Sequence, residues 1–214
     1  MAGVPVSGFL ANLYLKNMDE WFFERDMIYA RYSDDVIVFA QTKDVILFYE
    51  HTIKAFLNDK GLTINNKKEV RTQPGETWEF LGFSFHNGKI DISDIALQKM
   101  KAKIRRKARA LVRWKNKTGA SNERTIRAFI RYFTIKFYDN PRENELTWCR
   151  WYFPILTTDE RLHILDEYMV SAIRYIATGK HIKANYNLRY DAIKNMGYRS
   201  LVNAYYCYKK TGML

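Results

Sequence analysis

Apolar residues follow two different periods in the first 92 residues of the chain. Between residues 9 and 23 they recur every three or four positions, which predicts a helix with one buried face. Two β-prone runs, residues 28–32 and 36–40, flank a short polar stretch and predict a hairpin, and residues 43–57 predict a second helix with Gly61 as its C-terminal cap. Residues 62–70 predict a short strand or loop, and residues 78–92 predict a hairpin because Asn87-Gly88 separates two β-prone runs.

After about Ser93 the strand patterns disappear and amphipathic helices take over. One apolar stripe includes Met100 and Ile104, and a second, after Ser121 as N-cap, runs through residues 126–137. A third helix is predicted to start at a capping box formed by Thr157 and Glu160 and to stop at Gly179, and shorter helices are predicted at 189–196 and 200–208. We therefore expect an α+β fold with a mixed domain at residues 1–93 and a helical region at residues 94–214.

Composition and charge narrow the class of protein. The chain has 214 residues, of which 47% are hydrophobic, so it can bury a substantial core. Its formal net charge of +12 favours attraction to nucleic acid backbones or to anionic membrane surfaces. The two cysteines are far apart and the four histidines are scattered, which argues against a zinc site or a disulfide framework. No run approaches the roughly 20 apolar residues of a membrane span, and the start does not resemble a signal peptide, so we expect a cytoplasmic protein that does not enter a membrane.

Two adjacent carboxylates occupy the tip of the first predicted hairpin. Asp34 and Asp35 follow Tyr32-Ser33, and the tight turn confines both charges to a small volume. A divalent cation such as Mg²⁺ would relieve their repulsion, as in sites where carboxylates and substrate phosphates share the metal. The alternative is that Ser-Asp-Asp is simply good turn chemistry.

Four motifs in order resemble bacterial reverse transcriptases, and the group II intron-like enzymes in particular. Tyr32-Ser33-Asp34-Asp35 is similar to their Tyr-x-Asp-Asp motif. The other three resemble the loop and helix before that motif, a lysine-bearing segment after it, and a Phe-Leu-Gly hairpin. They are residues 3–19, residues 61–68 and residues 80–83.

The resemblance implies a partial polymerase palm, an antiparallel sheet with helices, followed by an all-helical thumb with a C-terminal helical extension. It also implies an RNA template and a DNA primer as partners, and a role for each of the following residues. Asp34 and Asp35 would be catalytic ligands of Mg²⁺ or Mn²⁺; Gly3, Pro5, Ser7, Tyr32 and Lys68 would bind the nucleotide; Phe80, Leu81 and Gly82 would grip the primer. Alternatives remain, since Lys68 could belong to a solvated charged turn and Phe80 and Leu81 could be core residues.

The sequence departs from the family in two places. Ala2 stands where the family usually has glutamine, which puts the detail of the nucleotide pocket in doubt. The family's third metal-binding aspartate would lie before Met1, together with the fingers, so we expect the chain alone to be inactive or nearly so. A partner chain could supply these parts, and the sheet edge left open predicts a dimer or oligomer.

Residues 101–117 contain nine lysines and arginines and no acidic residue. Because the apolar stripe of this helix is committed to packing, we expect the basic residues to project outward and to follow a template–primer backbone. The residues assigned to this role are Lys101, Arg105, Arg106, Arg109 and Arg113. A solvated basic face without a partner is the alternative. The aromatic residues of the C-terminal region could stack on bases, but we expect most of them to be core.

Three functions are therefore open. The first is the C-terminal part of an RNA-directed DNA polymerase. The second is a catalytically inactive remnant that binds nucleic acid through its basic helix. The third, an RNA-directed RNA polymerase, also carries paired aspartates at a hairpin, but the Phe-Leu-Gly hairpin and the basic helical region argue against it.

Overall fold

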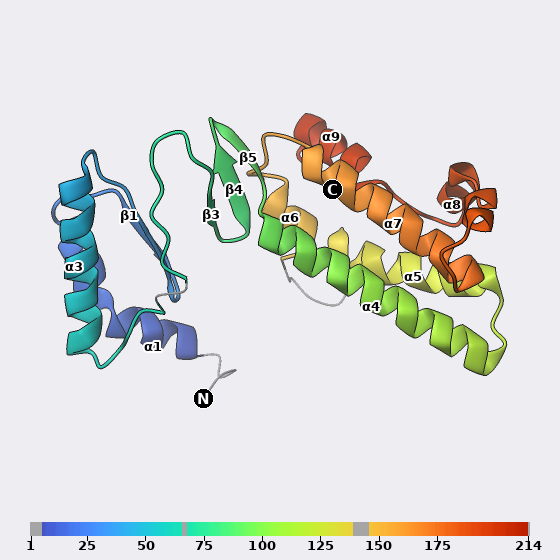
Figure 1. Ribbon diagram of the computed structural model, residues 1–214, viewed down its shortest axis with the longest axis horizontal. Helices are drawn as coiled ribbons and strands as arrows, with labels where there is room; N and C mark the ends of the chain where they lie inside the picture. Colours follow the sequence, from blue (N-terminus) through green and yellow to red (C-terminus); the bar gives the residue numbers. More distant parts are fainter. Residues whose placement is uncertain (1–5, 66–67, 139–145, 214) are drawn as a thin grey trace. The chain divides into compact units, whose positions relative to one another are not determined.

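The computed structural model describes residues 6–65, 68–138 and 146–213, and the chain packs as two compact units (Figure 1). The first unit comprises Met1–Pro74 and the second Gly75–Leu214. Helices and small antiparallel sheets are both present, which confirms the α+β class.

The first unit contains a two-stranded antiparallel ribbon with helices beside it. Its elements are α1 (Ser7–Tyr14), α2 (Lys16–Phe23), β1 (Tyr29–Tyr32), β2 (Asp35–Val38) and α3 (Lys43–Asp59). The single helix expected at residues 9–23 is instead two helices that meet at Leu15, where the backbone leaves helical geometry (φ −103°, ψ 9°). The hairpin and the second helix are confirmed, whereas the described part of residues 62–70 contains no strand.

A small core holds the first unit together. Met18 and Phe22 of α2 and Tyr49 and Ile53 of α3 are buried, and the Phe22 ring stacks on Tyr29 of β1 with 4.4 Å between ring centroids. The side chain of Thr42 caps α3, and Gly61 adopts the left-handed conformation (φ 68°) predicted for a residue that follows a helix. By contrast, no residue of α1 is buried.

The second unit begins with a three-stranded antiparallel sheet in the order β3-β4-β5. The strands are β3 (Trp78–Phe80), β4 (Phe83–His86) and β5 (Lys89–Ile92). Two-residue turns connect them, Leu81-Gly82 with φ of 50° and 85° and Asn87-Gly88 with φ of 47° and 74°. Two consecutive positive φ angles are the mark of a type I′ turn, which suits the twist of a hairpin. The hairpin predicted at Asn87-Gly88 is confirmed.

Helices make up the rest of the second unit. They are α4 (Asp94–Thr118), α5 (Asn122–Phe137), α6 (Trp148–Tyr152), α7 (Glu160–Thr178), the 3₁₀ helix η1 (Lys183–Asn187), α8 (Tyr190–Asn195) and α9 (Leu201–Thr211). Ser93 and Ser121 cap α4 and α5 through their hydroxyl groups, and α4 and α7 end at Gly119 and Gly179 in the left-handed conformation. No helix was predicted from the sequence at the position of α6.

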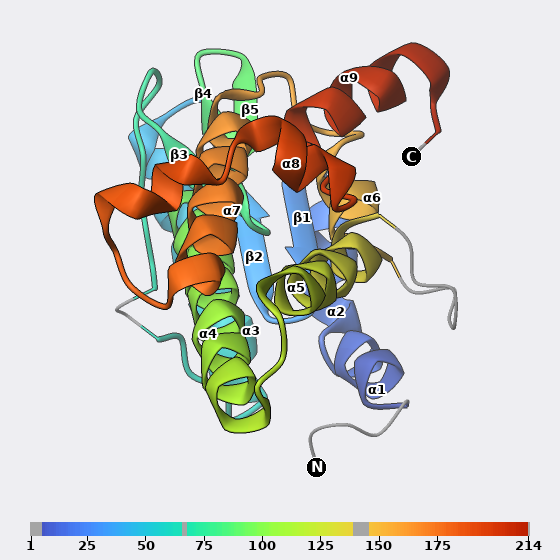
Figure 2. The same cartoon turned by 90° about the vertical axis from the view of Figure 1, so that its right-hand side faces the viewer.

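Helices α4 and α7 run side by side in the same direction, with α5 packed against both (Figures 1 and 2). At the start of the pair, Asp94 of α4 forms an ion pair with Arg161 of α7. Near the end, Lys115 of α4 donates to the carbonyl oxygens of Ile176 and Ala177 at 2.7 and 3.1 Å. These two ties join the helices at both ends.

The capping box expected at the start of α7 is wrong. Asp159 occupies the N-cap position, and the Thr157 hydroxyl instead accepts a hydrogen bond of 2.8 Å from the amide of Ile90 in β5. The amide of Thr157 donates to the Ile90 carbonyl at 3.0 Å as well. Thr157 therefore bonds to the backbone of the edge strand β5 and does not cap the first turn of α7.

The two compact units meet between Pro74 and Gly75, which is earlier in the chain than the domain boundary predicted near Ser93. Phe83 and Ile92 of the sheet are buried in one core with helical residues such as Ile104, Phe133 and Leu165. This shared core explains why residues 75–93 pack with the helices. None of the described helices has the length and apolar character needed to cross a bilayer.

Candidate metal-binding hairpin and basic helix

The tip of the β1–β2 hairpin presents two exposed carboxylates. Tyr32 and Asp35 form the last strand pair, and Ser33 and Asp34 form the two-residue turn. Ser33 has a φ of 59°, the positive angle that a type II′ turn requires at its first position. Because the turn is this short, the Asp34 and Asp35 side chains start from adjacent positions at the end of the ribbon.

Arg31 connects the turn to the helices of the first unit. Its Nε and Nη2 donate to both carboxylate oxygens of Asp19 at 2.9 and 2.5 Å, and its Nη1 donates to the Ser33 carbonyl at 2.9 Å. The same Nη1 reaches Oδ1 of Asn12 in α1 at 3.2 Å, and the Tyr29 hydroxyl donates to Asp19 at 2.6 Å. Only 5% of the Arg31 side chain is exposed. The guanidinium thus holds the backbone of the carboxylate turn.

Arg31 was not among the site residues predicted from the sequence. A signal was present, because Tyr29 and Arg31 alternate with exposed Ala30 and Tyr32 along β1 and so share the face toward the helices. An arginine on the inner face of a strand needs an acidic partner, and Asp19 is the acidic residue in the first turn of α2. Burial opposes ionisation of Asp19, but its bonds with Arg31 and Tyr29 outweigh that effect and lower its pKa below the usual value.

The paired aspartates fit a metal ion only in part. Two carboxylates on one short turn suit Mg²⁺, which commonly takes one or two protein carboxylates and keeps several waters. Across residues 6–65, 68–138 and 146–213, no group of three or more acidic, histidine or cysteine side chains could hold a metal ion.

The predicted nucleotide-binding residues are only partly described. Gly3 and Pro5 lie outside the described residues, while Ser7 begins α1 and is exposed. Tyr32 is 59% exposed at the hairpin end. Lys68 is exposed and its amide donates to the Asn65 carbonyl at 2.8 Å, which is compatible with the charged-turn alternative as well as with a nucleotide contact.

Of the predicted primer-grip residues, Phe80 ends β3 and is half-buried, and Leu81 and Gly82 form the β3–β4 turn of the second unit. Leu81 packs against the core of that unit, and the Gly82 carbonyl accepts a 2.8 Å bond from the amide of Ser93. A Cβ on Gly82 would lie 2.7 Å from the Tyr152 hydroxyl oxygen. The turn is therefore fixed by close packing, and the core alternative is supported for Leu81.

The basic residues of α4 divide into two groups. The arginines at 105, 106, 109 and 113 are exposed, and at 100° per residue they fall within an arc of about 100° on one side of the helix. Three lysines depart from the expected outward orientation. The amine of Lys101 lies over the Tyr168 ring, that of Lys107 lies over Tyr132, and Lys115 is tied to α7 as described above.

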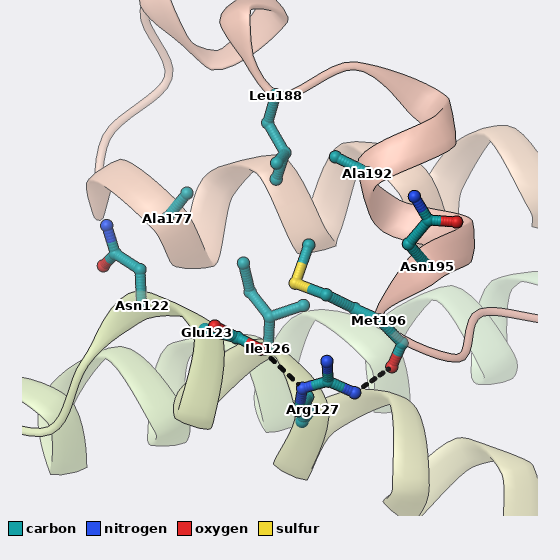
Figure 3. Close-up of a pocket in the computed structure, with 9 residues that line it drawn as sticks. All are labelled: Asn122, Glu123, Ile126, Arg127, Ala177, Leu188, Ala192, Asn195 and Met196. Carbon is teal, nitrogen blue, oxygen red and sulfur yellow. Dashed lines mark hydrogen bonds and ion pairs between the residues drawn. The ribbon is translucent and has the colours of Figure 1, made fainter.

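A pocket of about 430 Å³ lies among α5, α7 and α8, and Figure 3 shows the residues around it. Its arginine, Arg127, donates to Glu123 at 2.8 Å and to the Met196 carbonyl at 3.4 Å, so its charge is already paired. None of the predicted site residues lines this pocket. We assign it no role.

The hairpin lies in a part of the chain that matches a known protein family. Residues 1–85 match the sequence model of the family described as reverse transcriptase (RNA-dependent DNA polymerase). The retron Ec86 reverse transcriptase of Escherichia coli is 28% identical over 106 residues, which cover 48% of this chain and 33% of that relative. The chain thus spans about a third of the length of this curated relative.

Residues 1–85 therefore match the reverse transcriptase family, which supports the resemblance to bacterial reverse transcriptases. The matched segment runs from α1 into β4 and includes the carboxylate turn and Arg31. The closer likeness to group II intron-like enzymes stays a prediction.

Proposed function

We propose that the chain supplies the Tyr-x-Asp-Asp hairpin of a reverse transcriptase palm together with a thumb that binds the template–primer duplex. The observation that carries this proposal is the two-residue turn that presents Asp34 and Asp35 within the segment matched to the family. In this role the two carboxylates hold Mg²⁺ or Mn²⁺, which would neutralise charge on the incoming triphosphate. Tyr32, Ser7 and Lys68, with Gly3 and Pro5, are assigned to the nucleotide, and residues 80–82 to the primer end.

The metal role has a direct test that does not depend on catalysis. Mn²⁺ added to the chain should broaden the amide NMR signals of residues 33–36, and Asp34→Asn/Asp35→Asn should abolish that broadening. Asp44→Asn/Asp59→Asn removes two exposed carboxylates of the same unit and is the matched control. Equal broadening in the double variant and the parent chain would remove the metal site from the proposal.

The thumb role rests on the exposed arginines of α4. Neutralising three phosphate contacts should lower the slope of log affinity against log salt by about 2 to 3. Arg105→Gln/Arg106→Gln/Arg109→Gln should show this loss on an RNA–DNA hybrid measured by fluorescence anisotropy. Lys180→Gln/Lys183→Gln/Lys210→Gln, which removes three exposed charges elsewhere in the same unit, should not. Identical slopes for the two variants would contradict the assignment.

Polymerisation by this chain alone is not expected. The described residues provide two carboxylates where the two-metal mechanism needs a more complete ligand set. A primer-extension assay with the purified chain should give no Mg²⁺-dependent product. The second candidate function, an inactive nucleic-acid-binding remnant, also predicts no primer extension. It differs in predicting that Mn²⁺ does not bind near residues 33–36.

A partner strand or a second copy of the chain is the remaining part of the proposal. Within the described residues β1 and β2 pair only with each other, so the outer edge of each strand is open to another strand. Phe9, Leu10 and Leu13 of α1 are exposed and apolar, which also favours contact of this unit with a partner chain or a second copy. Light scattering that reports a strictly monomeric mass at high concentration would contradict self-association.

A further inference from the structure

A second pocket, of about 590 Å³, opens in the helical unit between α4, α5 and α6. This volume is in the range of pockets that bind small organic groups. Its lining combines two lysines with several aromatic rings. It contains none of the residues assigned above to metal, nucleotide or primer.

The two lysines come from two neighbouring helices, with Lys103 exposed and Lys136 half-buried. Lys103 belongs to α4 and Lys136 to α5, and both line the pocket. Burial, the charge of Lys136 and the charge of Arg106 all lower the pKa of Lys103. The fold therefore places two ammonium groups where they repel each other, with a third cation nearby.

No acidic side chain of the described ranges forms an ion pair with Lys103 or Lys136, although thirteen other close charge pairs occur there. The pocket in Figure 3 differs in this respect, because its arginine is paired with Glu123. A bound anion would relieve the repulsion between the two lysines.

The other wall of this pocket is aromatic. Trp148 and Trp151 of α6 are half-buried, and Tyr132 of α5 is 39% exposed. Trp148 packs on Tyr152 with 4.5 Å between ring centroids, and the amine of Lys107 lies 4.2 Å from the centroid of Tyr132. The partly exposed ring of Tyr132 beside two lysines suits a ligand that has both a planar ring and a phosphate.

We propose that this pocket holds one nucleotide of a single-stranded nucleic acid, with its phosphate between Lys103 and Lys136 and its base against the aromatic wall. The strand must be unpaired there, because bases in a duplex are already stacked and cannot enter a pocket. The exposed arginine face of α4 reads a duplex backbone, whereas this pocket on another side of the same helix takes a strand that leaves the duplex. The inference rests on the nucleic-acid-binding part of the proposed function.

The test compares two probes on the complete chain. A single-stranded 8-mer and a blunt RNA–DNA hybrid are titrated by fluorescence anisotropy at several salt concentrations. Lys103→Gln/Lys136→Gln should weaken binding of the 8-mer at least tenfold and lower its salt slope by about 1.4, the value for two phosphate contacts on a single strand. Its affinity for the hybrid should change less than twofold.

Lys99→Gln/Lys117→Gln is the matched control, since both residues are exposed on α4 and neither lines the pocket. If the control weakens the 8-mer as much as the pocket variant does, the pocket is not the site. Arg105→Gln/Arg109→Gln/Arg113→Gln, which leaves Arg106 beside the pocket in place, should show the opposite preference and lose the hybrid first. If that variant binds both probes as tightly as the parent chain does, the arginine assignment is wrong. The result for the pocket variant would not be affected.

A competition arm tests the aromatic wall. Adenosine 5′-monophosphate should displace the 8-mer at a concentration at least tenfold below that needed for inorganic phosphate. Equal potency of the two competitors would overturn recognition of the base. Tyr132→Leu should remove most of the difference between them, and an unchanged difference would count against stacking on this ring.

Discussion

Arg31 and Asp19 form a two-point ion pair in which Nε and Nη2 of the guanidinium meet both carboxylate oxygens at 2.9 and 2.5 Å. The third nitrogen of the same group, Nη1, holds the carbonyl of Ser33 in the turn. Asp19 of α2, acting through Arg31, thereby restrains the hairpin that carries Asp34 and Asp35. The restraint makes Arg31 a positioning residue for the proposed metal site.

Replacing Arg31 should loosen the hairpin tip before it affects the rest of the chain. Arg31→Met leaves the partly exposed Asp19 without its cation and should cost about 1–3 kcal/mol in the first unit. Hydrogen exchange at residues 32–35 should accelerate accordingly. Arg31→Lys is the control: it keeps the charge but cannot make the planar two-point contact, so its effect should fall between those of the parent and Arg31→Met. Unchanged exchange in Arg31→Met would show that the turn does not need this anchor.

The Asp19 contact also predicts how the hairpin responds to acid. Its pKa is lowered from an ordinary value of 3.8, so the folded state favours the ionised form more than the unfolded state does. The stabilisation is fully present above that value and is lost as pH falls through the lower pKa of the folded state. NMR shifts of residues 29–35 followed from pH 6 to pH 2 should report the loss. The Asp19→Asn variant should be less stable than the parent chain at pH 6. The NMR shifts of its residues 29–35 should change little between pH 6 and pH 2.

Asp166 of α7 organises the start of α9. Its carboxylate accepts bonds from the hydroxyls of Tyr198 and Ser200 at 2.6 Å and from the amides of Leu201 and Val202 at 2.8 and 3.1 Å. Asp166→Ala should therefore destabilise the second unit by about 2–4 kcal/mol, because four donors lose their acceptor.

The neighbouring Glu167 is exposed and provides the control for that measurement. Glu167→Ala should change the free energy of unfolding by less than about 0.5 kcal/mol in urea titrations. Similar losses in the two variants would mean that the contacts to α9 contribute little.

The turn at Gly82 should tolerate a methyl group less well than the turn at Gly88. Both glycines have positive φ, 85° and 74°, so alanine costs about 1–2 kcal/mol of backbone strain at either position. Only at Gly82 would the new Cβ meet another atom at 2.7 Å, the Tyr152 hydroxyl oxygen, whereas nothing lies within 4 Å at Gly88. Gly82→Ala should therefore lower the thermal midpoint more than Gly88→Ala. Adding Tyr152→Phe to Gly82→Ala should remove most of the difference between the two sites, and failure of that rescue would contradict the steric explanation.

The sequence predicted those elements whose signals are local. The hairpin at Asn87-Gly88, the serine cap at residue 121 and the glycine stop at 179 depend on a few neighbouring residues and were predicted. The cap at Ser93 and the stop at Gly119 are equally local but had not been anticipated. The capping box at Thr157 failed because a hydroxyl has more than one partner within reach. The amide of Ile90, 67 residues earlier in the chain, takes that hydroxyl, and a local pattern does not reveal such a partner.

The candidate site shows the same limit. Asp34 and Asp35 could be located from the turn and the family resemblance, while the Arg31–Asp19 contact depends on how α2 packs against β1. Likewise, the charge run in α4 was evident, but its division into exposed arginines and lysines held by Tyr168, Tyr132 and α7 depends on the neighbouring helices. The Lys103–Lys136 pair joins residues from two helices and was not anticipated.

The ties of α4 to α7 at both ends have a consequence for the energetics of recognition. Asp94 with Arg161 and Lys115 with the last carbonyls of α7 keep α4 from bending or fraying separately. Arg105 and Arg113 are eight residues apart and so stay about 12 Å apart along the axis whether or not a ligand is present. The helix is preorganised, so association costs little ordering of the backbone, and the free protein already displays the charge spacing that a duplex would meet.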